Sequence, residues 1–513
     1  MMDAANQDIS SENLATAIAN TSLAVSDQVT GQEVGNDDSS TTALFFTGSI
    51  LDSQKQPEDS EITLTSHGNV NFAIQSDQEH EMDGFIHSNE AAIIRKQGMT
   101  IDVSHPDWSK INKHIFILSE AGKPIYSRYG NEEKLVTIMG VMQALVSFVQ
   151  DSDDTLQSLV AGNRKYVFLV KGPLILVAVS SLEDSVPQLQ LQLTYVYHQI
   201  LSVLTGAQLE KIFEQLRNYD LRKLLGGTEK FLHNLLDMMD RDPSFFLESV
   251  QCLPIPVHYR DSIASSLQHA KTKSLVFAIL ITENQLITLV RPKKYNLHPA
   301  DLHLIINLVN ASTSFQSCES WLPICLPKFN DSGYLHAHIS YLSEECPACL
   351  VLLSTDKDAF YELAESREKI IKRLTVKSNC IPVISEAITT NKYGLDYIIG
   401  SEIWHFLYKS KTYGQFVSPK CRPPYNTVEE QTRLQELYKY LHHRMHASAK
   451  PLKLVYRLRS QEALLGWISE TFELYAVFNP LVSKTVAIGN VKRLMAIIKQ
   501  EEDKLFIVNA RTF

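Results

Sequence analysis

Residues 113–150 combine two kinds of hydrophobic spacing. Residues 115–118 form a short apolar run and residues 125–129 alternate apolar with polar side chains, with turn residues at 122–124 between them. This pattern predicts a β-hairpin. From residue 135 the spacing becomes i, i+3, i+4, i+7, which predicts an amphipathic helix that ends near residue 150. Its apolar stripe consists of Leu135, Ile138, Met139, Met142, Leu145, Val146 and Val149.

The opposite face of this predicted helix is also uncharged, because no ionisable residue lies between Lys134 and Asp151. A helix that covers a sheet usually shows charged side chains to water. One that is apolar around most of its circumference is therefore expected to be buried on two sides. The second side either packs against another layer of the same chain or binds a partner. It carries Val136, Gly140, Val141, Ala144 and Phe148.

The element order β-β-α-β-β-β-α is predicted three times along the chain. The first module continues from the hairpin and helix to residue 204, and the second runs from 275 to 374. The third runs from 403 to 499, followed by a possible extra strand at 504–508. Repetition of one order at about 130 residues predicts an α/β (α+β) protein built from three copies of a module of ordinary domain size.

Charge is distributed unevenly over the 513 residues, whose net charge is -10. Residues 1–90 contain sixteen Asp and Glu against one Lys, Lys55, so the rest of the chain carries roughly +5. The N-terminal segment is rich in polar residues and has few apolar runs, so it cannot bury enough surface to offset the entropy of ordering. We predict a disordered acidic arm at 1–104, a first domain at 105–206, a helical connector at 207–256, and further domains at 257–380 and 381–513.

The expected compartment is the cytosol. The sequence shows no basic segment followed by an apolar segment of the secretory type, and no stretch of about twenty apolar residues that would span a bilayer. The seven cysteines are odd in number and scattered, which is not typical of a disulfide framework.

Three segments carry a resemblance to a known family. They are KHIFILSEAGKPIYSRYGN at 113–131, MGVMQAL at 139–145 and LRKLLGG at 221–227. These segments closely resemble the SAND family of vacuolar fusion proteins, also called the Mon-one family, and the resemblance extends over about residues 105–513. It implies that the three modules are longin domains.

The resemblance further implies a regulatory subunit of a guanine nucleotide exchange factor, without catalytic residues or a cofactor of its own. Members pair through their first longin domain with the homologous protein Ccz-one, and the pair activates the late-endosomal GTPase Rab-seven. Recruitment to endosomes depends on Rab-five and phosphatidylinositol 3-phosphate, and the presence of a third subunit is left open. The implied location is the cytoplasm, with peripheral recruitment to late endosomes, lysosomes or vacuoles, and autophagosomes. The implied processes are endosome maturation, vacuole fusion and autophagy.

Under this resemblance, the uncharged helix face becomes a contact for the partner or the GTPase, together with Tyr129 and Asn131 at the end of the hairpin. Trp321 follows a polar segment at the start of a predicted strand, where a large aromatic side chain can anchor a partner. We expect Trp321 to serve recruitment by the second Rab. The alternative is an ordinary core tryptophan.

Basic residues in predicted loops are candidates for contact with anionic lipid. The alternative is ordinary solvated charge. The candidates are Arg291, Lys293, Lys294, Lys409 and Lys411, with Lys420 and Arg422 as a further pair.

No metal site is predicted. Cys346 and Cys349 form a lone pair, and His336 and His338 are spaced i, i+2 on a probable strand, without the second close pair that a structural zinc site needs. The histidines at 442–446 end a predicted helix, where positive charge suits the macrodipole and requires no ligand.

Other functional classes find little support. The sequence has no phosphate-binding loop, no nucleophile elbow and no His-Glu-x-x-His motif. An acidic chain without interleaved basic and aromatic residues also argues against binding of nucleic acid. The alternative to the exchange factor is a non-catalytic longin adaptor that binds SNARE or coat proteins.

Overall fold

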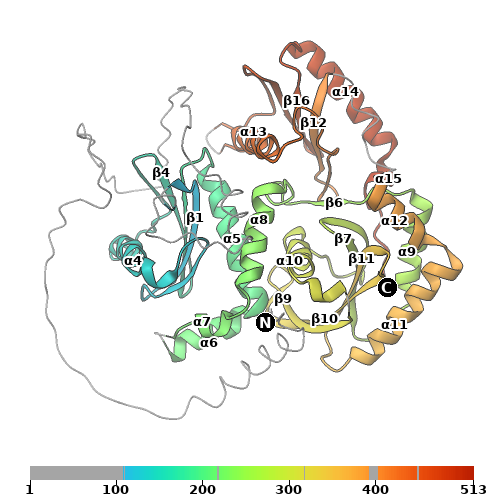
Figure 1. Cartoon of the computed structure of the whole chain (residues 1–513), viewed down its shortest axis with the longest axis horizontal. Helices are drawn as coiled ribbons and strands as arrows, with labels where there is room; N and C mark the ends of the chain where they lie inside the picture. The colour runs from blue at the N-terminus through green and yellow to red at the C-terminus, as the bar shows by residue number, and fades with distance from the viewer. Residues whose placement is uncertain (1–107, 109, 217–218, 317, 392–401, 448–449) are drawn as a thin grey trace, which may run out of the picture.

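The computed structural model describes residue 108 and residues 110–216, 219–316, 318–391, 402–447 and 450–513. The predicted acidic arm at 1–104 lies outside these residues. Within them the order β-β-α-β-β-β-α occurs three times, which confirms the predicted fold class of three modules (Figure 1). Each module forms an antiparallel sheet in which the strands, numbered by their order within the module, lie as 2-1-5-4-3.

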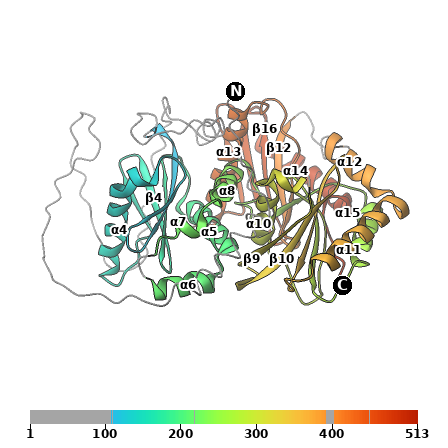
Figure 2. The same cartoon turned by 60° about the horizontal axis from the view of Figure 1, so that its bottom comes forward.

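The first module is a sheet between two helices. Its strand order is β2-β1-β5-β4-β3. Helix α4 covers one face and α5 covers the other, and Figure 2 shows α4 on the outer side and α5 toward the rest of the molecule. Ser185 caps α5 in a reciprocal capping box with Gln188, which fixes where this helix begins. The elements are β1 (Lys113–Ser119), β2 (Pro124–Ser127), a 3-10 turn (Glu132–Leu135), α4 (Val136–Gln150), β3 (Ser158–Ala161), β4 (Arg164–Lys171), β5 (Leu174–Ser180) and α5 (Val186–Val203).

The second module has helices on both faces of its sheet. Helix α10 packs on one face, and α9 (Val257–Gln268), α11 and α12 (Cys380–Thr390) pack on the other. The strands are apolar on both sides, as expected for a covered sheet. Its elements are β7 (Leu275–Thr282), β8 (Gln285–Val290), α10 (Pro299–Asn310), a 3-10 turn (Thr313–Gln316), β9 (Ser320–Leu326), β10 (Asn330–Ser343), β11 (Cys346–Ser354), α11 (Phe360–Lys372) and a π-helical turn (Arg373–Lys377).

The third module repeats this arrangement. Helix α13 packs on one face of its sheet and α14 on the other. Its elements are β12 (Ile403–Ser410), β13 (Gln415–Val417), α13 (Val428–His446), β14 (Leu454–Leu458), β15 (Ala463–Ile468), β16 (Phe472–Phe478), α14 (Lys484–Gln500) and α15 (Glu502–Leu505).

The connector at 207–256 is not entirely helical, which corrects the sequence prediction. Besides its helices it contains a three-residue strand, β6, which pairs in parallel with β8 of the second module and β13 of the third. In the described residues this joins the two sheets into one of 11 strands. A strand this short has no periodicity to detect, and its pairing is decided by tertiary contacts. The elements are α6 (Gly206–Gln215), α7 (Arg222–Leu225), α8 (Glu229–Arg241), β6 (Val250–Cys252) and, beyond it, α9 (Val257–Gln268).

Two other segments differ from the sequence interpretation. Helix α12 (Cys380–Thr390) lies almost wholly within the residues assigned to the third domain, but Ile384 and Ala387 join the core of the second module. The prediction of a possible strand at 504–508 is wrong. The chain forms α15 there, and the amides of Leu505 and Phe506 donate to carbonyls one turn back. Short apolar segments such as this one fit a strand and a buried helix end equally well.

A buried charge cluster attaches the hairpin of the first module to the connector. Arg128 Nη2 lies 2.7 Å from Asp240 Oδ2 and 3.1 Å from Asp237 Oδ1, both on α8. Lys113 Nζ on β1 lies 2.8 Å from Asp184 Oδ2 and 3.5 Å from Asp240 Oδ1. All five side chains are buried. The cluster therefore fixes the hairpin, and the helix that follows it, relative to the rest of the molecule.

Candidate partner-binding site

The outer face of α4 is exposed and apolar. Its inner face packs Met139, Met142 and Val146 against the sheet, and in the described part of the chain no element covers the other side (Figure 1). In the described residues, therefore, no second layer of this chain buries the outer face. The exposed large side chains are Val136 (50%), Val141 (37%), Leu145 (41%) and Phe148 (67%).

The outer face has the arrangement of large and small side chains that suits packing against another helix. Val136, Gly140, Ala144 and Phe148 follow one another at i+4 and form one row. The two small residues in the middle have much shorter side chains than Val136 and Phe148 at the ends, and the space above Gly140 is open, since a Cβ added there would meet nothing within 4 Å. A contiguous apolar surface of this kind marks a protein contact more often than scattered single residues do.

Leu145 belongs to this face, although the periodicity placed it on the inner stripe. At 100° per residue it lies at the border between the two faces. The inner face centres on Met139, Met142 and Val146, so Leu145 is turned outward. No signal in the sequence distinguishes such a border residue from an inner one, because both are apolar.

Asn131 is exposed and has a structural role at the entry to α4. Its Oδ1 accepts a hydrogen bond from the amide of Glu133 at 2.8 Å, which caps the 3-10 turn that leads into the helix. The preceding Gly130 has φ +93°, a conformation that favours glycine. Asn131 thus sets the direction of α4 and also lies on the surface beside it.

Tyr129 does not lie on the surface, which corrects its place among the predicted contact residues. Its side chain is only 4% exposed and packs with Ile111 and edge-on against the ring of His114. The indole of Trp108 donates to the Tyr129 carbonyl at 3.1 Å. The alternation of the hairpin could not show that these aromatic residues pack against one another.

Trp321 is half-buried in β9, so it is neither a fully exposed anchor nor a fully buried core tryptophan. Its Nε1 donates to the carbonyl of Lys357 at 3.1 Å, and its ring stacks on His336 and meets Phe360 edge-on. Nearby Tyr361 is exposed. The structure thus places an aromatic surface around Trp321, and its role in recruitment stays a prediction.

Three of the five predicted lipid-binding residues form a hydrogen bond or an ion pair within the chain, and a fourth, Lys294, places its Nζ 4.6 Å from the centre of the Tyr295 ring. Arg291 donates through Nη1 to the carbonyl of Tyr295 at 2.5 Å. The Nζ atoms of Lys409 and Lys411 lie 3.9 and 3.4 Å from Glu473 Oε1. Lys293 and Lys294 are exposed. Lys409 is directly opposite Glu473 on the neighbouring strand, a pairing that the sequence alone does not reveal.

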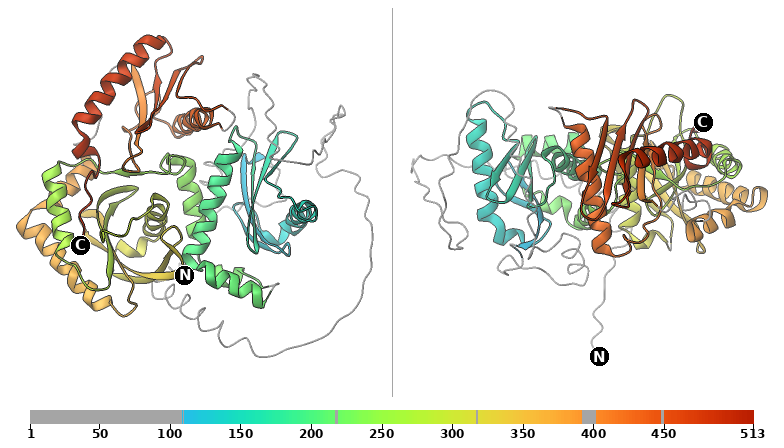
Figure 3. Two further views of the ribbon diagram at one scale, coloured as in Figure 1. Left: turned by 180° about the vertical axis from the view of Figure 1, so that it is seen from behind. Right: turned by 90° about the horizontal axis from the view of Figure 1, so that it is seen from above.

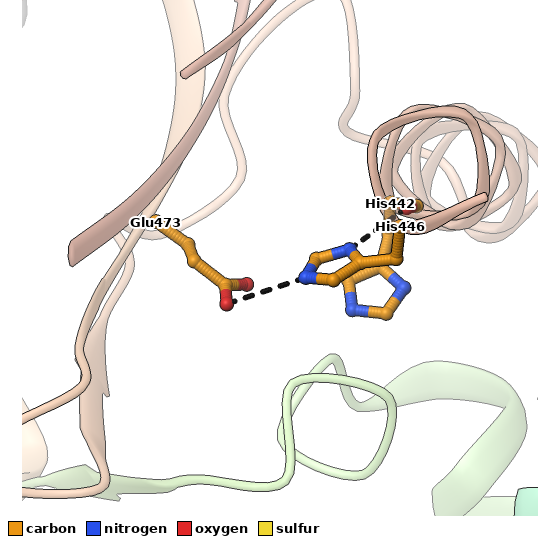
Figure 4. A group of neighbouring side chains, drawn as sticks. All are labelled: His442, His446 and Glu473. Atoms are coloured by element: carbon orange, nitrogen blue, oxygen red, sulfur yellow. Dashed lines mark hydrogen bonds and ion pairs between the residues drawn. The ribbon is translucent and has the colours of Figure 1, made fainter. Parts of the chain in front are cut away.

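Glu473 is also the centre of a group that could hold a metal ion. The ligand atoms of His442, His446 and Glu473 lie within 4.8 Å of one another (Figure 4). However, the carboxylate already accepts from Tyr475 Oη at 3.0 Å and pairs with His446 Nε2 at 3.4 Å. Because two lysine ammonium groups also face it, a metal cation there would meet like charge. We therefore interpret the group as an ion-pair network.

The pKa values of the two histidines of this network are shifted in opposite directions. Burial lowers the pKa of His442 to about 3, so it is neutral at physiological pH. The hydrogen bond to Glu473 raises the pKa of His446. Burial alone would raise the pKa of Glu473, but the hydrogen bond from His446 and the charge of Lys409 outweigh it and lower that pKa to about 2.

This network predicts a specific loss of stability in acid. A carboxylate whose pKa is depressed on folding stabilises the protein above its unfolded pKa and loses that contribution as pH falls from about 4.5 to about 2. We expect Glu473→Gln to lower stability by on the order of 2 kcal/mol near neutral pH and by progressively less in acid. Thermal melting between about pH 6 and pH 3 measures this. Glu365→Gln, which breaks an exposed pair with Lys369, is the control and should leave the pH profile unchanged. A gap between Glu473→Gln and wild type that stays constant in acid would contradict the account.

The cysteine and histidine residues that were considered as zinc ligands are not brought together. In the pairing of β10 with β11, His338 lies opposite Leu352 and Cys349 lies opposite Tyr341. His338 Nε2 is instead 2.9 Å from Glu319 Oε2.

None of the helices in the described residues combines the length and the apolar character that a membrane span requires.

Comparison with known proteins agrees with the repeated architecture. Family models for the first, second and third Longin domain of FUZ, MON1 and HPS1 match residues 113–235, 273–372 and 402–502. The chain is 48% identical over 412 residues to vacuolar fusion protein MON1 homolog A of Gallus gallus, covering 80% of this chain and 75% of that protein. It is 46% identical over 412 residues to Protein SAND of Takifugu rubripes, covering 80% and 79%.

A more distant relative shows the same coverage. Vacuolar fusion protein MON1 homolog B of Mus musculus is 39% identical over 426 residues, covering 79% of this chain and 76% of that protein. The three domain matches and the extent of these similarities show that the chain belongs to the MON1/SAND family of longin-domain proteins.

Proposed function

We propose that this chain is one subunit of a heteromeric guanine nucleotide exchange factor for a late-endosomal GTPase of the Rab-seven type. The names of its relatives connect them with vacuolar fusion. The observation that carries the proposal is the outer face of α4, a wholly uncharged helix surface that stays exposed on the chain alone. Its partner is a second longin protein resembling Ccz-one.

Such a factor requires no nucleophile and no general base. It binds the nucleotide-free GTPase more tightly than the nucleotide-bound form, and by linkage it loosens the nucleotide by the same factor. Accelerating release about a thousandfold requires roughly 4 kcal/mol of preferential stabilisation of the opened state. An interface of about 1,600 Å² can supply this. In the proposal, the outer face of α4 and the neighbouring Asn131 provide this chain's share of that interface.

The proposal is tested by release of a fluorescent nucleotide from a Rab-seven GTPase. We expect acceleration when both longin proteins are present. The GTPase alone gives the basal rate, and each longin protein alone shows whether the pair is required. If the pair forms but leaves the rate at its basal value, the chain acts as a non-catalytic adaptor for SNARE or coat proteins.

Recruitment to the membrane is proposed to use the aromatic surface around Trp321 and a GTPase of the Rab-five type. We expect Trp321→Ala to reduce binding to membranes that carry this GTPase in its GTP form, while exchange on soluble Rab-seven continues at the wild-type rate. The reason is that Trp321 lies in the second module, apart from α4 of the first. Vesicle flotation measures recruitment. Since Trp321 packs on His336 and Phe360, a melting curve of the variant serves as the control for folding. Unchanged recruitment would contradict this role.

A further inference from the structure

The two edges of the 11-stranded sheet differ in how the molecule covers them. At one edge, β9 pairs with β10, and helix α5 of the first module packs beside it. At the other edge, β14 pairs with β15 alone, and no further strand follows it in the described residues. The edge at β14 therefore presents a row of backbone donors and acceptors without a neighbouring strand.

The register with β15 determines which backbone groups of β14 point outward. Residues of an antiparallel pair alternate between those that exchange hydrogen bonds with the neighbouring strand and those that direct them away from it. The carbonyl of Lys453 accepts from the amide of Ile468. The amide of Arg459 donates to the carbonyl of Glu462, so the odd-numbered residues bond to β15. The outward groups belong to Leu454, Tyr456 and Leu458.

The residues whose backbone groups point outward are uncharged. Leu454 and Leu458 are 40% and 62% exposed, and Tyr456 lies between them on the same side of the strand. The hydroxyl of Tyr456 donates to the carbonyl of Val482, which brings the segment before α14 beside the strand. In that segment Leu481 is 91% exposed. The exposed leucines thus lie on the α14 side of the free edge.

The opposite side of the strand is basic. Val455 packs into the core beneath α13. Lys453, Arg457 and Arg459 share its side because side chains alternate, and all of them are exposed. None of these cations forms an ion pair with a described residue, and Arg459 lies over the ring of Tyr440, with Cζ 4.7 Å from the ring centre. A strand added at this edge meets leucines on one side and positive charge on the other.

The strand β14 lacks the features that usually keep an edge from binding another strand. Such features include a very short strand, a proline, a bulge and charged outward residues. The edge strand β3 of the first module has only four residues. In contrast, β14 contains no proline, its register with β15 is continuous, and exposed leucines occupy its outward positions. This edge is therefore suited to accept a strand.

We propose that β14 binds an extended acidic segment of another protein, which adds to the sheet as a further strand. Backbone hydrogen bonds to the outward groups of β14 provide affinity, and side-chain contacts provide specificity. Because directly opposed residues share a face, apolar side chains of the segment lie opposite the leucines, and acidic ones lie opposite Lys453 and Arg457. The ligand is thus a segment in which apolar and acidic residues alternate.

This surface is separate from the site of the proposed function and goes beyond it. In Figures 1 and 3, α4 and α14 lie well apart, on the first and third modules. Tyr456, which shares the side of the β14 leucines, packs against the core beneath α14. The chain can therefore bind an acidic segment at β14 while the outer face of α4 contacts a longin partner.

The test measures binding of the full chain to a short fluorescent peptide that alternates valine and glutamate. We expect saturable binding by fluorescence anisotropy. Leu458→Ser leaves the charge unchanged and should weaken this binding at least about fivefold. The matched control, Val376→Ser, changes a side chain of the second module that is 74% exposed and should stay within about twofold of wild type. Equal affinities of the two variants would overturn the proposal.

A charge exchange tests which side of the strand the acidic residues contact. Lys453→Glu/Arg457→Glu should weaken binding of the valine–glutamate peptide at least about tenfold and strengthen binding of a peptide that alternates valine and lysine. The preference between the two peptides is therefore expected to reverse. An unchanged preference for glutamate, or an equal loss of both peptides, would contradict the proposed contact.

Two further measurements identify the binding mode and the occupant. An N-methylated form of the valine–glutamate peptide keeps every side chain but has no amide donors for β14, so it should not bind measurably. Binding equal to that of the unmodified peptide would exclude strand addition. A photoreactive amino acid at position 458 of the full chain should crosslink to the added peptide. A crosslink to residues 1–104 of the same chain in its place would assign the edge to this chain's own acidic segment and overturn the proposal of a separate partner.

Discussion

Phe148→Asp should prevent the chain from pairing with its longin partner while leaving the chain itself folded. Phe148 is 67% exposed, so the substitution costs the isolated chain little. In the proposed complex it becomes the large aromatic side chain at the end of the buried row on α4. Truncating such an anchor typically costs about 2–4 kcal/mol, and a buried carboxylate adds a desolvation penalty. We therefore expect pairing at least about thirtyfold weaker, and nucleotide exchange by the mixture near its basal rate.

The chain offers a closely matched control for this experiment. Val160 is also 67% exposed and belongs to the same module, but it lies on the edge strand β3 and not on α4. Val160→Asp should pair normally. Calorimetric titration gives both affinities, and melting curves show whether both variants fold. Wild-type pairing by Phe148→Asp would remove the outer face of α4 from the proposed interface.

Arg128→Met should destabilise the first module strongly. The substitution keeps much of the side-chain length but leaves Asp237 and Asp240 buried without their main counter-charge. Burial alone raises the pKa of Asp240, but the charges of Arg128 and Lys113 hold it well below its usual range. Removing one member of a buried ion pair costs about 3–5 kcal/mol, because an uncompensated charge stays in the interior.

An exposed pair in the connector provides the comparison. Arg222 and Asp220 also form an ion pair, at 2.8 Å, but their side chains are 44% and 28% exposed. Arg222→Met should therefore change stability by less than about 1 kcal/mol. Denaturant unfolding followed by a probe in the first module measures both variants. If Arg128→Met unfolds at the same denaturant concentration as Arg222→Met, the buried cluster does not anchor the hairpin.

The repeated architecture was predictable because its strands are apolar runs separated by clear turns. The predicted hairpin strands at 115–118 and 125–129 overlap β1 and β2, and the predicted helix ends with α4 at residue 150. The strand β6 was not predictable, since three residues carry no period and the strand exists only because β8 and β13 flank it. The orientation of α12 toward the second module likewise depends on tertiary packing.

The candidate site was predictable where it depends on the composition of one helix. The absence of charge on α4 is visible in the sequence, and the structure places Val136, Val141 and Phe148 in solvent. Contacts between distant residues were not visible. The charge cluster joins Arg128 to Asp237 across 109 residues, and Lys409 finds Glu473 on a neighbouring strand. Both lysine and arginine side chains look like ordinary solvated charge until their partners are known.

A photo-crosslinking measurement tests the central claim most directly. A photoreactive amino acid is placed at position 148 or, as the control, at position 160, and each chain is mixed with the Ccz-one-like protein and illuminated. If the outer face of α4 is the pairing surface, position 148 forms a crosslink to the partner and position 160 does not. A stable complex in which position 160 crosslinks to the partner and position 148 does not would contradict the account.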